Sequence, residues 1–349
     1  MRYKLLGKSG LRVSELCLGT MTFGEDWGWG ASQDESRQIF ETFVEAGGNF
    51  IDTANMYTNG SSEKIVGELI AKDRDRFVVA TKYSFPNKMG DSTGNPNGSG
   101  NHRKNLIQSL EGSLKRLNTD YIDLLWLHVW DFTTPIAEVM RALDDMVRQG
   151  KVMYIGISDT PAWIVSQANT LAQCHGWTSF VALQIEYSLI ERTPERDLLP
   201  VAQAFEMAVT PWSPLAGGVL TGKYNQDGME KSTTRGREIP ERSLKIAEVV
   251  GQVAQEIGCS PSQVALAWLC AQSAAIIPIL GASKLSQFKD NLACIEVSLP
   301  SEQLKRLNEV SQIELGFPHN FLDSEMIHKS LFGGTYSLLD NPRKFIRNT

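Results

Sequence analysis

The sequence predicts an α/β fold, a (β/α)8 barrel (TIM barrel), in which eight parallel strands alternate with helices. Eight apolar runs recur along the chain, and amphipathic helical patterns separate them. The runs are hydrophobic at nearly every position, as strands covered on both faces require, so parallel pairing is expected. The same order of elements also fits a doubly wound open sheet, which is the less favoured arrangement.

Each predicted strand is a short apolar segment. The segments cover residues 16–20, 49–53, 77–82, 121–128, 152–158, 181–187, 208–213 and 275–281. The pattern after the third segment shows how the intervening helices are recognised: Leu106, Leu110 and Leu114 fall on one stripe, whereas Glu111 faces away. Asn118 can then end that helix.

A hydroxyl residue before proline marks several helix starts, because proline fits the first turn of a helix and a hydroxyl can cap it. The pattern occurs at Thr134-Pro135, Thr160-Pro161, Thr193-Pro194 and Ser260-Pro261. At the last of these, Gln263 completes a capping box.

Three segments do not fit the strand and helix repeat. Residues 3–13, with a turn at Ser9-Gly10, predict an antiparallel β-hairpin that could close the N-terminal end of the barrel. The polar loops 83–102 and 223–242 follow the third and seventh strands, so both are expected to overhang the C-terminal, active-site face. The tail, residues 316–349, follows the last helix and could reach that face too.

Composition is that of an ordinary globular protein. The length of 349 residues would suggest about two domains by size alone, but barrels of this length commonly form one domain. We therefore expect a single barrel domain over residues 1–349, with 316–349 as an appended tail. A net charge of −6 without a Lys/Arg cluster argues against a nucleic-acid partner and favours a small-molecule substrate.

Cysteines and apolar runs bear on the compartment. The five cysteines are odd in number and scattered, which suits thiols in a reducing compartment better than a disulfide framework: Cys17, Cys174, Cys259, Cys270 and Cys294. The N-terminal apolar run is too short for a signal peptide, and the run at 274–280 is too short for a membrane span. We therefore expect a cytoplasmic protein that does not enter a membrane.

Four polar residues at or just beyond the ends of three successive strands carry the functional prediction. They are Asp52, Tyr57, Lys82 and His128. Taken singly, each has an ordinary role: a turn residue, a half-exposed aromatic, a solvated strand end and a core imidazole. In a parallel barrel, however, all strand ends open on one face, so the four side chains are expected to converge. Together they could deliver a proton to a carbonyl oxygen.

Of two common nucleotide-binding motifs, one is absent from the sequence and the other is incomplete. No G-x-G-x-x-G follows the first strand, so a Rossmann site is unsupported. Residues 217–223 copy a Walker A loop up to its lysine, but Tyr224 stands where a hydroxyl must bind Mg²⁺.

The four polar residues resemble the catalytic tetrad of the aldo-keto reductases, and the resemblance extends from about Leu16 to Asn291. It implies an NADP(H)-dependent enzyme that reduces an aldehyde or ketone, with Tyr57 as proton donor. It further implies that Lys82, kept charged by Asp52, eases the proton transfer and that His128 orients the carbonyl.

The resemblance also implies where the cofactor lies, with NADP(H) favoured over NAD(H). The implied cofactor-binding residues are Gly19, Thr20, Asp52, Ser158, Asp159, Gln184, Trp212, Ser213, Leu215, Gly281, Ser283, Lys284, Gln287 and Asn291. Two positions depart from the usual pattern. Asp159 stands where Asn is commoner and loses the amide donor, and Gln287 replaces a frequent Arg, which weakens the NADP preference without removing it. Trp212 either stacks on the nicotinamide or packs in the core.

Aromatic and apolar residues on the predicted catalytic loops suggest an aromatic or aliphatic substrate. The candidates are Trp27, Trp29, Tyr83 and Trp130, with Met56, Phe85 and Phe132 as further possibilities. Loop tryptophans can equally be packing anchors, and a pocket uses few of the aromatics near it.

Two other classes of function remain open at this point. A nicotinamide-binding regulatory or redox-sensing subunit with little turnover, similar to the barrel subunits of potassium channels, would keep the same tetrad. A metal-dependent barrel hydrolase would need clustered His and carboxylate ligands at strand ends, where only His128 is found. No metal site is expected, and the oligomeric state is not readable from the sequence.

Overall fold

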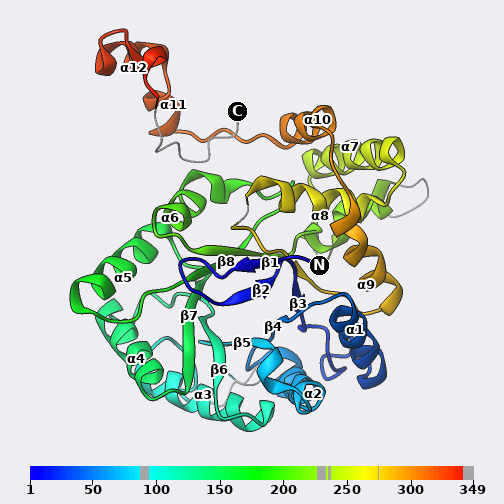
Figure 1. Ribbon diagram of the computed structural model, residues 1–349, viewed down its shortest axis with the longest axis vertical. Coiled ribbons are helices and arrows are strands. Elements are labelled where there is room, and N and C mark those ends of the chain that lie inside the picture. Colours follow the sequence, from blue (N-terminus) through cyan, green and yellow to red (C-terminus); the bar gives the residue numbers. More distant parts are fainter. Residues whose placement is uncertain (87–93, 226–232, 235–236, 274, 341–349) are drawn as a thin grey trace.

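The structure of the chain is a computed structural model, shown in Figure 1. It describes residues 1–349 with the exception of 87–93, 226–232, 235–236, 274 and 341–349. Parts of the two long loops and the end of the tail, for which the sequence makes predictions, lie outside the described residues.

Eight parallel strands form the barrel, which confirms the predicted fold. Their order is β12, β3, β4, β5, β6, β7, β8 and β9. They span Cys17–Gly19 (β3), Phe50–Asp52 (β4), Val78–Tyr83 (β5), Ile122–Leu127 (β6), Val152–Ser158 (β7), Ala182–Glu186 (β8), Ala208–Trp212 (β9) and Ile279–Leu280 (β12). All eight lie within the predicted segments to within one residue.

The barrel closes between β12 and its neighbours. β12 pairs with β3 in parallel, and on the other side a single bridge joins Val209 of β9 to Ile276. Pro278 lies directly before β12 and lacks an N–H, which helps to explain why this strand is the shortest in the barrel. The seam is therefore made by a few backbone hydrogen bonds, such as Ile277 N–H to Val209 O at 2.8 Å.

Helices surround the strands (Figure 1). They span Gln33–Glu45 (α1), Ser61–Ile70 (α2), Arg103–Leu117 (α3), Ile136–Arg148 (α4), Ala162–His175 (α5), Leu198–Ala204 (α6), Glu241–Ile257 (α7), Pro261–Gln272 (α8), Leu285–Leu292 (α9) and Ser301–Ser311 (α10). The helix predicted after β5 is α3, and Asn118 ends it in a left-handed conformation, as expected. The main hydrophobic core lies between the strands and these helices.

Only one of the four hydroxyl and proline pairs caps its helix through the hydroxyl. Ser260 and Gln263 form the predicted capping box at the start of α8. At α4 and α5 the capping position is the proline itself, without a side-chain cap, and Thr160 instead donates its hydroxyl to Ser158 O. Thr193 begins a 3-10 turn, Thr193–Arg196 (η3), and not an α-helix. Proline thus marks these starts correctly, but the threonine hydroxyls make other contacts.

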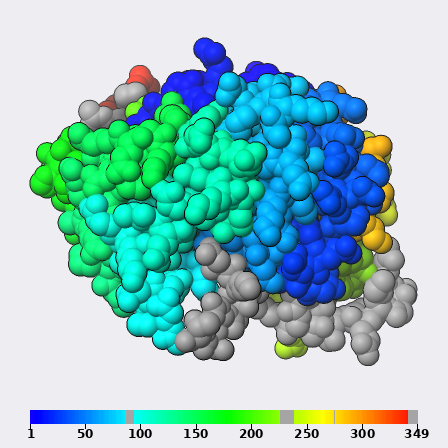
Figure 2. Space-filling model, turned by 90° about the horizontal axis from the view of Figure 1, so that it is seen from below, coloured from blue at the N-terminus to red at the C-terminus, as the bar shows by residue number. Residues whose placement is uncertain are grey.

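The N-terminal hairpin closes one end of the barrel, as predicted. It consists of β1 (Tyr3–Leu5) paired antiparallel with β2 (Arg12–Ser14). Leu6 and Val13 lie in one buried cluster with barrel residues such as Trp126. In the side view of Figure 2 the darkest blue residues, which belong to this hairpin, form the upper end of the molecule.

The tail projects from the barrel. It contains α11 (His319–Leu322) and α12 (Glu325–Phe332), which Figure 1 shows set apart beyond α6 and α10. Its hydrogen bonds include Asn320 N–H to Gly316 O and His328 N–H to Ser324 O, both internal. In Figure 2 the red residues of the tail lie at the same upper end of the molecule as the hairpin, so the expectation that the tail reaches the active-site face is wrong for the tail residues drawn in colour.

Candidate active site

Three neighbouring strands bring the charged part of the site together. Asp52 is the last residue of β4, Lys82 the penultimate residue of β5, and His128 follows β6. The register places Asp52 opposite Ala80 and Lys82 opposite Trp126. Asp52 therefore pairs two residues before Lys82, and Lys82 pairs two residues before His128, so the three positions step along the strands toward the same carboxyl end of the barrel.

Lys82 is the centre of the hydrogen-bond network. Its Nζ lies 2.5 Å from Asp52 Oδ2, 2.9 Å from Thr53 O and 3.1 Å from the hydroxyl of Tyr57. The side chain of Lys82 is 0% exposed and that of Asp52 is 4% exposed. All three donors of the ammonium group are therefore used, which holds the group in one orientation.

Tyr57 is held by a strained turn. It begins the 3-10 turn Tyr57–Gly60 (η1), and the next two residues, Thr58 and Asn59, have φ angles of 45° and 54°. Such angles are uncommon outside glycine and persist only where surrounding contacts impose them. The buried hydroxyl of Thr58 supplies such contacts, since it donates to Phe23 O at 2.7 Å and accepts from Ser62 N–H at 3.0 Å.

Hydroxyl groups beneath the site fix the end of β4. Thr20 donates its hydroxyl to Asp52 O at 3.0 Å and lies 2.8 Å from the hydroxyl of Ser62, which in turn lies 2.9 Å from that of Thr53. All of these groups are buried. Thr20 thus uses its hydroxyl to position the end of β4.

His128 lies beside the phenol ring. The backbone N–H of His128 donates to Tyr83 O at 2.9 Å. The centre of its ring lies 6.1 Å from that of the Tyr57 ring, edge to face at 82°. Phe85 covers the other side at 4.8 Å. The Nδ1 atom is buried and has no partner among the described residues. The imidazole therefore has hydrogen-bonding capacity left for a bound molecule.

Electrostatics favour a protonated phenol beside an ammonium. Burial raises the pKa of Tyr57, and the positive charge of Lys82 only partly offsets this. Burial alone would lower the pKa of Lys82, but Asp52 and Tyr57 outweigh it, so this pKa is raised. For His128, burial and the charge of Lys82 both act in one direction and hold the pKa well below 6.5. Near neutral pH the site thus contains a phenol, an ammonium and a neutral imidazole.

The predicted nicotinamide contacts lie on the next strands. Gln184 on β8 donates from Nε2 to Asp52 Oδ1 at 3.0 Å, which ties that strand to the tetrad. The hydroxyl of Ser158, at the end of β7, is buried without a partner of normal geometry among the described residues. A buried polar atom without a partner is costly, so this hydroxyl fits a contact to a bound amide group.

Asp159 and Trp212 interact with each other. The indole of Trp212 donates to Asp159 Oδ1 at 3.0 Å, and Asp159 has a φ of 40°. Burial raises the pKa of Asp159, with opposing contributions from Trp212 and Lys82. Trp212 also packs against the apolar interior of the barrel, so it contributes to the core and to the rim of the site. Ser213 and Leu215 follow it directly.

The predicted adenosine segment lies at the start of α9. Lys284 occupies the capping position without a side-chain cap, and Lys284, Gly281 and Gln287 are exposed, whereas Asn291 is buried. Ser283 is half-buried. An additional residue was not predicted: Glu35 of α1 accepts the Leu285 N–H. One backbone N–H at the start of α9 is therefore already hydrogen-bonded to a carboxylate.

The aromatic candidates divide into two groups. Trp27 lies 6.5 Å from the Tyr57 ring, and Trp29 lies 5.4 Å from Trp27 and is 49% exposed. Tyr83 is 0% exposed and lies in the main core, so the prediction that it contacts substrate is contradicted. Lys82 and Tyr83 are neighbours on one strand, so their side chains point to opposite faces and cannot both face the site.

Trp130, Met56 and Phe132 differ in exposure. Trp130 is 7% exposed and belongs to the main core, and Met56 is 8% exposed. Phe132 is 69% exposed. Their contact with a substrate stays a prediction, because the site residues Lys82 and Asp52 are themselves almost fully buried.

Residues that sequence reasoning missed contribute both backbone and side-chain groups. Thr53 accepts from Lys82 through its backbone carbonyl oxygen, whereas Ser84, whose φ is 125°, accepts the backbone N–H of His128 through its hydroxyl at 3.2 Å. Asn101 and Asp131 join the loops after β5 and β6, with Asn101 N–H to Asp131 Oδ2 at 2.7 Å. A carbonyl contact has no signature in the sequence, because every residue carries a carbonyl.

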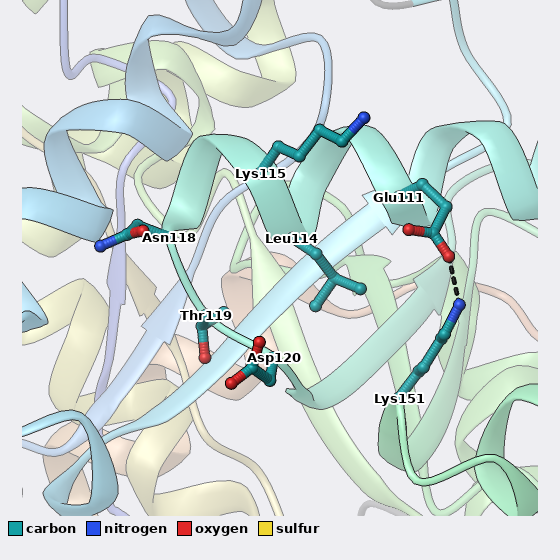
Figure 3. A pocket seen from close by; sticks show the side chains of 7 residues that line it. All are labelled: Glu111, Leu114, Lys115, Asn118, Thr119, Asp120 and Lys151. Carbon is teal, nitrogen blue, oxygen red and sulfur yellow. Dashed lines mark hydrogen bonds and ion pairs between the residues drawn. The ribbon is translucent and has the colours of Figure 1, made fainter.

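Two hollows lie at the opposite end of the barrel. One of about 480 Å³ is lined by the end of α3, the turn after it and Lys151, which pairs with Glu111 (Figure 3). The other, of about 900 Å³, lies between the hairpin, α6 and α8 and is lined by residues such as Lys4, Tyr187 and Cys270. Neither includes a tetrad residue.

No helix among the described residues is both long enough and apolar enough to cross a membrane. Within the same part of the chain there is no group of three or more His, Cys, Asp or Glu side chains that could hold a metal ion.

Known proteins resemble this chain over most of its length. The profile of the aldo/keto reductase family matches residues 15–312. A norsolorinic acid reductase of Aspergillus flavus is 39% identical over 91% of this chain and 83% of its own length. A putative aryl-alcohol dehydrogenase of Saccharomyces cerevisiae is 36% identical, with coverages of 95% and 92%. An aryl-alcohol dehydrogenase [NADP(+)] of Phanerodontia chrysosporium is 38% identical, with coverages of 92% and 89%.

Proposed function

Because this chain belongs to the aldo/keto reductase family, we propose that it uses NADPH to reduce aromatic aldehydes or ketones to alcohols, with Tyr57 as the proton donor. The chain is an oxidoreductase that acts on carbonyl and alcohol groups. The observation that carries the catalytic assignment is the position of Lys82 Nζ, 3.1 Å from the Tyr57 hydroxyl and 2.5 Å from Asp52.

The proton comes from the phenol of Tyr57. A reduced nicotinamide, when bound, would supply the hydride for the carbonyl carbon. As the carbonyl oxygen gains negative charge, Tyr57 transfers its proton to that oxygen, and the nearby Lys82 stabilises the phenolate that remains. Asp52 keeps Lys82 charged in a buried site, where an unpaired ammonium would be costly.

His128 serves the substrate in a different way. Its imidazole is neutral near pH 7, because burial and Lys82 lower its pKa. A neutral imidazole can donate one hydrogen bond to the carbonyl oxygen without releasing its own proton. This side chain therefore orients the carbonyl and is not the acid.

The cofactor contacts follow from the strand ends. The buried hydroxyl of Ser158 and the side chain of Gln184 would hold the amide of the nicotinamide, and Trp212 would border its ring. Ser283 and Lys284 would meet a 2′-phosphate at the start of α9, where a helix N-terminus favours anions. Glu35 opposes this preference, so we expect a moderate selectivity for NADPH over NADH.

The aromatic substrate class rests on Trp27, Trp29 and Phe85, which lie around Tyr57 and His128. Relatives named aryl-alcohol dehydrogenases are consistent with this choice. We also propose a cytoplasmic location, because the scattered cysteines suit a reducing compartment.

A panel of carbonyl compounds tests the proposal. Purified protein should oxidise NADPH in the presence of benzaldehyde-type substrates faster than with short aliphatic aldehydes, measured by the absorbance of NADPH. NADPH should bind more tightly than NADH, and Lys284→Ala should narrow that preference by up to about fivefold, the limit for an exposed charge contact. Tight NADPH binding without turnover on any carbonyl would instead indicate a regulatory or sensing subunit.

A further inference from the structure

Two cysteines far from the tetrad lie side by side. Cys270 is near the end of α8, and Cys294 lies in the 3-10 turn Ala293–Glu296 (η6) that follows α9. Their thiols form a hydrogen bond. Neither residue is part of the proposed carbonyl reduction, so their proximity calls for a separate explanation.

The two thiols have unequal access to solvent. Cys294 is 2% exposed, whereas Cys270 is partly exposed and lines the hollow of about 900 Å³ at the hairpin end of the barrel. Lys4 lines the same hollow, and its charge acts on Cys270. A small dissolved oxidant could therefore reach Cys270 before it reaches Cys294.

The two thiols also differ in acidity. The hydrogen bond from Cys294 lowers the pKa of Cys270, with support from Lys4 and against burial and the charge of Glu15. The same hydrogen bond and burial raise the pKa of Cys294. Because Cys270 lines the hollow and Cys294 is buried, we assign Cys270 as the thiol that meets the oxidant and Cys294 as its neighbouring partner, and the direction of the pKa change at Cys270 agrees with this.

We propose that Cys270 and Cys294 form an oxidisable dithiol, in which a hydroperoxide converts Cys270 to a sulfenic acid and Cys294 then closes a disulfide. In the first step the Cys270 thiolate attacks one peroxide oxygen, the O–O bond breaks, and the leaving oxygen takes up a proton as water or an alcohol. In the second step the Cys294 sulfur attacks the Cys270 sulfur, the S–O bond breaks, and hydroxide leaves with the Cys294 proton as water. The two thiols lose two electrons, and the peroxide gains them.

The disulfide would link two segments that already contact each other. Ser260 and Gln263 at the start of α8 donate to Asp290 of α9 at 2.8 Å and 2.9 Å. A bond between Cys270 and Cys294 would add a covalent link farther along α8 and close a loop that contains β12 and α9. Such a link lowers the conformational entropy of the unfolded chain more than that of the folded one. Oxidation is therefore expected to raise the unfolding temperature by roughly 2–5 °C.

The test is oxidation of the purified protein with a small excess of hydrogen peroxide, followed by alkylation, trypsin digestion and mass spectrometry. A Cys259→Ser variant is used beside the unmodified chain, because Cys259 and Cys270 fall in the same tryptic peptide. The expected product joins the Cys270 peptide to the Cys294 peptide, is lighter by two hydrogen atoms and separates on reduction. Cys174, which is exposed, serves as the internal comparison: its thiol should stay reduced during the oxidation and should therefore be alkylated afterwards.

Single variants distinguish the two roles. Cys294→Ser should leave Cys270 as a sulfenic acid that dimedone traps, whereas the unmodified chain should give at least tenfold less of that adduct because Cys294 consumes it. Cys270→Ser should leave Cys294 reduced. Full alkylation of both cysteines after oxidation of Cys174, or equal dimedone trapping with and without Cys294, would overturn the proposal.

Discussion

At the carboxyl end of the barrel, charged groups are buried and the backbone is strained, whereas the amino end is filled with apolar side chains beneath a hairpin. Lys82 and Asp52 lie buried at the first end, and positive φ angles occur there at Thr58, Ser84 and Asp159. At the other end Leu6, Val13 and Trp126 share a buried cluster. Single left-handed residues also occur at the amino end, at Asn118 and Glu206, but there they stand at helix ends and turns. At the carboxyl end such residues lie beside the buried pair of Lys82 and Asp52, and this combination indicates which end is built for chemistry.

The two ends of the barrel should therefore differ in what their residues determine, the rate of the reaction or the stability of the fold. Substitutions at the carboxyl end should alter the reaction, and those at the amino end should alter the free energy of unfolding while the reaction continues. Substitutions at either end of the barrel therefore test this division.

The largest effect is expected from Tyr57→Phe, which removes the proton donor and keeps the ring. The rate of reduction should fall by about 10² to 10⁴, the usual contribution of a general acid, while NADPH affinity stays nearly unchanged. Tyr83→Phe is the matched control, since Tyr83 is buried in the core and its hydroxyl makes only a 3.4 Å contact to Asn101 O. Steady-state kinetics and cofactor fluorescence measure both. Equal losses in the two variants would contradict the assignment.

Lys82→Met should affect both properties, because it leaves the buried carboxylate of Asp52 without its cation. The free energy of unfolding is expected to fall by about 3–5 kcal/mol, as for a broken buried ion pair. Adding Asp52→Asn should recover part of that loss, since the unpaired charge is then removed. Urea unfolding of the two variants measures the difference. Unchanged stability in Lys82→Met would show that the pair is better solvated than the structure indicates.

Gly7→Ala should destabilise the amino end without slowing the reaction. Gly7 has a φ of +56°, and a Cβ there would lie 2.1 Å from Val181 O. We expect a loss of roughly 1–3 kcal/mol in the free energy of unfolding, with kcat/KM unchanged. Gly10→Ala is the control, because a Cβ at Gly10 meets nothing within 4 Å. A large loss of kcat/KM in Gly7→Ala would break the division between the ends.

The smallest effect is expected from shortening the tail. A chain ending at Leu315 keeps the contact between Arg196 and Glu314 O and lacks α11 and α12. Its ratio of kcat/KM for a bulky and a small carbonyl should stay within about twofold of the full chain, as for surface changes away from a site. Phe85→Ala, by contrast, removes the ring next to His128 and should change that ratio. A larger change of this ratio in the shortened chain would show that the tail contributes to substrate choice.

The sequence predicted the barrel and the convergence of its four polar side chains well, because both depend on strong local patterns. Apolar runs locate buried strands, and Lys82 or His128 at the end of such a run is unusual enough to be recognised. Substrate contacts were predicted less well, since nearness in sequence does not give direction. Tyr83 could have been excluded by strand alternation, because Lys82 already faces the site.

Other features could not have been predicted from the sequence. The path of residues 316–340 follows from no pattern in the sequence, and the pairing of Cys270 with Cys294 depends on how α8 and η6 pack. The role of Glu35 at the start of α9 requires two helices far apart in the chain to meet.

The most direct test of the central claim, that Tyr57 supplies the proton while His128 stays neutral, is the pH dependence of kcat/KM for carbonyl reduction. The pKa of Tyr57 is raised above 10.0, and that of His128 lies well below 6.5. The phenol therefore stays protonated across the neutral range, and kcat/KM should be constant from about pH 6 to about pH 9 and fall only at higher pH. A fall centred near pH 6.5 as the pH rises would identify an imidazolium as the acid and contradict the account.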